Sequence, residues 1–158
     1  MIIKNLLISI SVCFAFALLG NLLIGDTLKW FNELEQPWFA LSFSGWLLVG
    51  SLYYMIVIAI FFRLLGMPTG PERKTLIRLT IAMLAGNEIW NLLFFGLEST
   101  LAGFTGLFPF TALVVVLFVK LLRSDRLSAW VLLPYLLWLV YDLIWAYYLW
   151  QLNSPTAI

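Results

Sequence analysis

The chain has 158 residues, of which 63% are hydrophobic and only 11% are charged, so it has too little polar surface to cover a water-soluble globule. A net charge of +1 argues against nucleic acid as a partner, and the absence of histidine excludes a haem held by an axial histidine. The single cysteine, Cys13, can form neither an internal disulfide nor a metal cluster. This composition predicts a membrane protein.

Five apolar segments follow in chain order, each close to the roughly 20 residues that cross a bilayer as a helix. We expect spans at residues 4–24, 43–65, 75–96, 104–122 and 128–152. The first apolar stretch is long for a secretory signal, so we expect a retained helix. Short connections favour antiparallel neighbours. The expected fold is all-α: a polytopic five-transmembrane-helix bundle that forms one domain over residues 1–158.

The basic residues gather on one side of the predicted bundle. Only Lys29, of the nine lysine and arginine residues, lies on the other side. The rest precede the first span or flank the second and fourth loops, and they are Lys4, Arg63, Arg73, Lys74, Arg78, Lys120, Arg123 and Arg126. This bias predicts a cytoplasmic amino terminus and an outer carboxy terminus, in the inner membrane of a bacterium or archaeon.

The first loop, residues 25–42, is rich in aromatic residues and lies on the predicted outer side. Two interpretations of Trp30, Phe31 and Trp38 are open. They cover the mouth of the bundle, or they lie in the membrane interface as an aromatic belt.

Two acidic residues lie inside predicted spans, where an ionisable group costs at least about 2.5 kcal/mol and normally faces the bundle interior. Helical rise puts Glu88 roughly 12 Å and Asp142 roughly 15 Å inside the outer ends of their spans. No lysine or arginine of this chain reaches that depth. We therefore expect Glu88 and Asp142 to converge on one cavity beneath the first loop.

Polar and aromatic side chains accompany these acids at helical spacing, namely Asn87 and Asn91 beside Glu88, and Tyr135, Trp138 and Trp145 on the face of Asp142. Two roles for the acids stay open. In one, they are protonated and hydrogen-bond to an asparagine or a backbone carbonyl, which joins the third and fifth spans. In the other, they line a pocket and receive a donor or a cation from a ligand, assisted by tryptophan faces.

The stretches GNEIWNLLFFG (residues 86–96) and LLPYLLWLVYDLIWAYYLWQLN (residues 132–153) resemble the TspO/MBR family of tryptophan-rich sensory and translocator proteins. The residues that fit the family patterns are Asn87, Trp90, Leu93, Phe94 and Phe95 in the third span, and Pro134, Tyr135, Leu136, Trp138, Leu152 and Asn153 in the fifth. The resemblance implies a five-helix bundle, often dimeric. It also implies a pocket beneath the first loop that accepts porphyrins, sterols or hydrophobic drug-like ligands.

This chain departs from the family pattern at several positions. Gly50 replaces a tryptophan that lines the family pocket, although Tyr54 is kept, and Asp142 replaces a small alanine. The missing ring argues against the light-dependent porphyrin breakdown attributed to some members. Trp46, one turn earlier, either refills this space or anchors its helix at the membrane interface.

The sequence thus predicts a membrane protein that binds or senses a planar hydrophobic ligand, such as a tetrapyrrole, a sterol or a lipid. We expect no metal site and no catalytic set. The expected ligand-binding residues are Trp46, Gly50, Tyr54, Asn87, Glu88, Trp90, Asn91, Phe94, Tyr135, Trp138, Asp142 and Trp145.

Two other functions are considered: a carrier for a small cationic or amine-bearing molecule that uses Glu88 and Asp142, and a structural or assembly subunit of a membrane complex. The small-residue spacing of Ala82 and Gly86 allows close helix approach, and so a homodimer through the third span.

Overall fold

The computed structural model describes residues 2–25 and 27–154. The elements are α1 (Ile2–Ile24), α2 (Leu28–Glu33), α3 (Phe43–Gly66), α4 (Pro71–Asn91), the π-helical turn η1 (Leu92–Gly96), α5 (Thr100–Ser124) and α6 (Arg126–Asn153). Five helices, with η1 continuing α4, are long and apolar enough to cross a membrane. The predicted all-α bundle of five spanning helices is confirmed.

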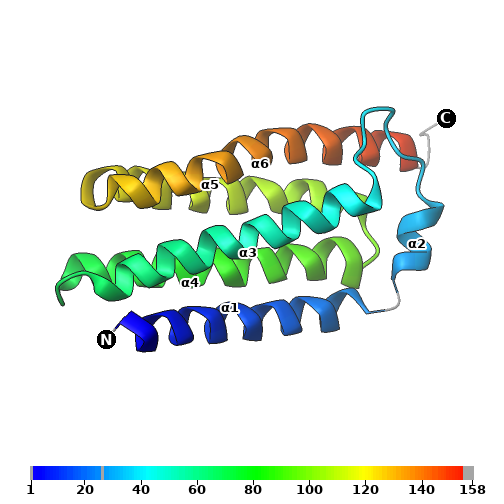
Figure 1. Ribbon diagram of the computed structural model, residues 1–158. Helices are drawn as coiled ribbons and strands as arrows, with labels where there is room; N and C mark the ends of the chain where they lie inside the picture. The colour runs from blue at the N-terminus through cyan, green and yellow to red at the C-terminus, as the bar shows by residue number, and fades with distance from the viewer. Residues whose placement is uncertain (1, 26, 155–158) are drawn as a thin grey trace.

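The long helices lie side by side and successive ones are antiparallel; the first loop, which contains α2, joins α1 to α3, and short turns make the other connections (Figure 1). Helix α5 packs between α4 and α6, while α1 packs against α3, α4 and η1. Helix α2 and the loop after it lie at the end of the bundle where α6 finishes, which we call the loop end (Figure 1). The amino terminus and the α3–α4 and α5–α6 turns lie at the opposite end.

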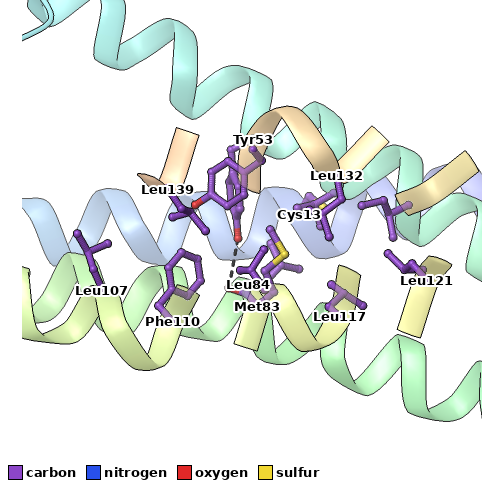
Figure 2. Close-up of a cluster of buried hydrophobic side chains, with 14 of the residues drawn as sticks. Cys13, Tyr53, Met83, Leu84, Leu107, Phe110, Leu117, Leu121, Leu132 and Leu139 are labelled. Atoms are coloured by element: carbon purple, nitrogen blue, oxygen red, sulfur yellow. Dashed lines mark hydrogen bonds between the residues drawn. The ribbon is translucent and has the colours of Figure 1, made fainter. Parts of the chain in front are cut away.

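The interior is a continuous cluster of leucine, valine and aromatic side chains from all five long helices (Figure 2). Within it the hydroxyl of Tyr53 on α3 donates a hydrogen bond to the backbone oxygen of Met83 on α4, at 3.3 Å. Large apolar side chains also cover the outward faces of the spanning helices, including Phe14, Leu48 and Leu137. Such all-round apolarity is expected of helices whose solvent is lipid.

Local chemistry explains several helix ends. Ser42 and Ser99 precede α3 and α5, and their hydroxyl oxygens accept hydrogen bonds from backbone N–H groups three residues later. Pro71 opens α4, a position where its missing N–H costs nothing. The turn η1 was not predicted, because we expected one uninterrupted helix over residues 75–96.

Candidate ligand-binding site

A cavity of about 470 Å³ lies inside the bundle toward the loop end, and this volume is typical of small-molecule sites. Every element of the fold contributes to its wall. The lining residues are Ala17, Gly20, Asn21, Ile24, Phe31, Phe43, Trp46, Leu47, Val49, Gly50, Ser51, Tyr53, Tyr54, Asn87, Trp90, Asn91, Phe95, Leu107, Phe110, Tyr135, Trp138, Asp142 and Trp145.

Most of the residues predicted for the site lie in this wall: Trp46, Gly50, Tyr54, Asn87, Trp90, Asn91, Tyr135, Trp138, Asp142 and Trp145. Glu88 and Phe94, which were predicted with them, are buried but are not part of the lining.

Indole rings from two helices form one side of the cavity. The ring centroid of Trp46 on α3 lies 4.5 Å from that of Trp145 and 5.3 Å from that of Trp138, both on α6. The indole N–H of Trp145 donates to the side-chain oxygen of Gln36 in the first loop, at 3.3 Å. Trp46 therefore packs into the site and is not an outward interface anchor.

Asp142 faces this cavity from α6, between Trp138 and Trp145 along the helix, and is only 6% exposed. Its Oδ1 atom is buried and has no hydrogen-bond partner among the described residues 2–25 and 27–154. No lysine or arginine is present in the described cavity wall. This oxygen of the carboxylate is therefore buried without a polar partner from the part of the chain that the structure describes.

Glu88, in contrast to Asp142, is surrounded by hydrogen-bond donors. Its Oε1 accepts hydrogen bonds from the hydroxyl of Tyr54 at 2.9 Å and from the amide of Asn87 at 3.1 Å. Its Oε2 accepts one from the amide of Asn91 at 2.9 Å, and Gly20 of α1 packs directly against it.

The prediction that both acids face one cavity is therefore wrong for Glu88, and only Asp142 lines the cavity. The reason is that Gly20 lacks a Cβ, which leaves room for the carboxylate of Glu88 between α1 and α4. Tyr54, Asn87 and Asn91 line the cavity, and Glu88 lies behind them.

Phe94, on η1, is buried among aromatic rings outside the cavity lining. It stacks on Trp90, with centroids 5.3 Å apart and planes 4° from parallel, and makes an edge contact of 5.3 Å with Trp30. Gly103 of α5 packs against it closely. Phe94 therefore fixes α2, η1 and α5 together behind the site.

The cavity opens sideways between α1 and α3. Asn21 of α1 and Leu47, Gly50 and Ser51 of α3 line the cavity and are also exposed, which marks its mouth. A Cβ atom added at Gly50 would meet nothing within 4 Å. The space that the family pattern assigns to a tryptophan is thus open here.

The first loop is fastened across the end of the bundle. Asn153 on α6 accepts from the backbone N–H of Glu35 and donates to its carbonyl oxygen, both at 2.9 Å. The hydroxyl of Tyr141 donates to the carbonyl of Phe39 at 3.1 Å and accepts from the N–H of Leu41 at 3.2 Å. These bonds hold the loop on α6 and close the cavity at this end.

Each interpretation of the loop aromatics fits different residues. Trp30 and Phe31 pack on Phe94, at 5.3 and 6.2 Å between ring centroids, and so cover the bundle end. Trp38 is 95% exposed at the loop tip, where an interface anchor would lie.

Sequence reasoning missed the contribution of α1. Ala17, Gly20 and Asn21 line the cavity, and Gln36 holds the indole of Trp145. The adjacent glycine and asparagine in an otherwise apolar span were the available signal.

Gly86 of the predicted small-residue pair packs on α5. A Cβ added to Gly86 would lie 2.9 Å from a ring carbon of Phe110. The close helix approach that this glycine allows is therefore made within the chain.

The comparison with known families agrees with the two sequence motifs. A model of the TspO/MBR family matches residues 9–151. The chain belongs to the TspO/MBR family. This TspO/MBR protein is also similar to the Tryptophan-rich protein TspO of Archaeoglobus fulgidus, with 26% identity over 158 residues that cover 96% of this chain and 99% of the relative. Family membership and the five apolar helices establish an integral multi-pass membrane protein, and they support a membrane binding or sensing role in general.

Proposed function

We propose that this TspO/MBR protein binds a planar hydrophobic ligand, a tetrapyrrole or a molecule of similar shape such as a sterol, in the cavity beneath the first loop. The observation that carries the proposal is an aromatic cavity of about 470 Å³ with its mouth between two membrane-spanning helices. Planar apolar molecules partition into lipid, so a mouth on the side of the bundle admits them without passage through water.

The wall suits such a ligand because it combines broad apolar rings with few polar groups. Trp46, Trp138 and Trp145 offer ring surface on one side, and Trp90 and Phe95 offer it on another. Aromatic stacking supplies contact area at little cost in conformational entropy.

A pair of neighbouring residues on α3 tests this site. Ser51 lines the mouth, whereas the adjacent Leu52 is exposed and lies outside the lining. We expect Ser51→Trp to obstruct the cavity and weaken binding of protoporphyrin dimethyl ester by about tenfold or more, while Leu52→Trp leaves it near the native value. The ester lacks the free carboxylates of a porphyrin, and its binding is followed by quenching of tryptophan fluorescence in lipid nanodiscs.

Empty nanodiscs correct for partition of the probe into lipid. Equal affinity in Ser51→Trp and Leu52→Trp would mean that the ligand binds elsewhere, and no saturable binding by the native protein would overturn the proposal.

A further inference from the structure

We propose that the ligand of this cavity carries a basic nitrogen, a protonated amine on an aromatic framework, which pairs with the carboxylate of Asp142. This inference rests on the proposed function, because it assumes that the cavity binds a ligand, and it names the chemistry of the ligand's polar end.

Asp142 is placed to recognise such a group. It is a cavity-lining side chain more than nine-tenths buried, and its Oδ1 has no partner among the residues described. A carboxylate within a membrane-spanning bundle normally pairs with another residue or marks a ligand pathway.

The described part of the chain supplies no cation to this site. The lining contains neither lysine nor arginine, and Arg63 pairs with Asp125 at the opposite end of the bundle. A cationic partner for Asp142 is therefore one that the ligand brings.

Two tyrosine hydroxyls of the cavity wall are already engaged elsewhere. Tyr53 donates its single O–H to the backbone oxygen of Met83, and Tyr54 donates its own to Glu88. Neither of these hydroxyls donates to Asp142, whose Oδ1 stays free to accept from a ligand that donates.

The aromatic residues beside Asp142 favour a cation for a second reason. Trp138 and Trp145 flank it on α6, and Trp46 contacts both of their rings. Indole faces attract ammonium groups most strongly among the aromatic side chains. An anionic ligand would gain nothing from these faces and would be repelled by Asp142.

Glu88 is not placed to serve as a second counter-ion, because it lies outside the cavity lining and its oxygens accept hydrogen bonds from Tyr54, Asn87 and Asn91. The chain therefore offers a matched control: a second buried acid outside the cavity lining.

The experiment uses three indoles that differ only in the end group of a short side chain: tryptamine with an ammonium, tryptophol with a hydroxyl and indole-3-acetate with a carboxylate. Binding is measured at neutral pH by titration calorimetry on the full chain in nanodiscs, with empty nanodiscs as the blank. We expect tryptamine to bind about ten- to a hundredfold more tightly than tryptophol, the range for a hydrogen bond to a charged group. Indole-3-acetate should bind most weakly.

Asp142→Asn keeps the shape of the side chain and removes its charge. It should abolish the preference for tryptamine and leave tryptophol affinity within about twofold. Glu88→Gln should retain the preference, measured on the folded fraction.

Equal binding of tryptamine and tryptophol by the native protein overturns the inference, and this comparison needs no variant to fold. A preference that survives in Asp142→Asn overturns it as well. The proposed function stands in either case if Ser51→Trp still blocks protoporphyrin dimethyl ester. Failure of the native protein to bind any of these probes, the ester included, overturns both.

Discussion

Glu88 and Asp142 are two buried carboxylates of one bundle, at 2% and 6% exposure, with different needs for a partner. The first is held by three donors from its own chain, and the second has an oxygen without any described partner. Burial alone therefore does not distinguish an acid that joins helices from one that faces a ligand. The surrounding donors distinguish them.

We expect Glu88→Gln to lower the free energy of unfolding by about 1 to 3 kcal/mol. The side-chain NH2 group of glutamine would replace one carboxylate oxygen, so at least one of the donors that now bond to Glu88 would lose its acceptor. Asp142→Asn should leave the free energy of unfolding unchanged or raise it, since no described hydrogen bond of Asp142 is lost. Thermal unfolding of both variants in one detergent measures the difference. An equal loss of stability in both would assign Asp142 to helix packing.

Asp125, in the turn between α5 and α6, makes the fold sensitive to acid. Arg63 donates two hydrogen bonds to it, at 2.9 and 2.7 Å, and the Ser128 hydroxyl donates a third at 2.6 Å. These bonds, those of Arg63 foremost, lower the pKa of Asp125 from its ordinary 3.8.

A lowered pKa means that the pair stabilises the fold fully above the ordinary pKa of 3.8 and that this contribution is lost as pH falls through the lower folded value. Asp125→Asn should therefore cost up to about 1 kcal/mol at neutral pH, a small value because Arg63 is partly exposed. The difference from the native protein should shrink below pH 3.8. Unfolding measured in steps of pH checks this, and a constant difference would contradict it.

The contact between α1 and α4 depends on one position without a side chain. A Cβ atom added at Gly20 would collide with the carboxylate of Glu88 and lie 3.2 Å from the amide nitrogen of Asn91. The carboxylate cannot move aside without breaking the hydrogen bonds that hold it.

Gly20→Ala should therefore destabilise the bundle by about 1 to 3 kcal/mol, although alanine is the better helix former. Gly66→Ala is the matched control, because a Cβ there meets nothing within 4 Å. Thermal unfolding compares the two. In a Glu88→Ala background the cost of Gly20→Ala should fall, and an unchanged cost would show that the glycine serves another contact.

The two ends of the bundle differ: basic residues gather at one end, and aromatic residues of the first loop cover the other. Most lysine and arginine residues lie in the helix ends that flank the α3–α4 and α5–α6 turns, at the end of the bundle opposite the first loop and the end of α6 (Figure 1). The excess of basic residues on one side predicts that this end faces the cytoplasm.

Cysteine labelling tests this orientation at two serines on opposite ends of the bundle (Figure 1). On a Cys13→Ala background, we expect an impermeant maleimide to label Ser154→Cys in intact cells and to reach Ser124→Cys only after lysis. Labelling of Ser124→Cys alone in intact cells would mean the reverse orientation.

The sequence by itself determined the number of spanning helices, their antiparallel order and the family. Each depends on local quantities: the length of an apolar run, the turn residues that interrupt it, and motifs such as Asn87 to Phe95 within one membrane span. The stripe from Tyr135 to Trp145 also follows from helical spacing alone, and its residues line the cavity together.

Tertiary structure alone decided which buried acid faces the cavity, that α1 closes one side of it, and that Trp46 packs inward. The physical reason is that lipid and protein interior are both apolar, so hydrophobic periodicity does not show which face of a spanning helix points inward. Helix rotation and tilt are set by packing between helices, here by contacts such as Gly20 against Glu88 and Trp46 against Trp145.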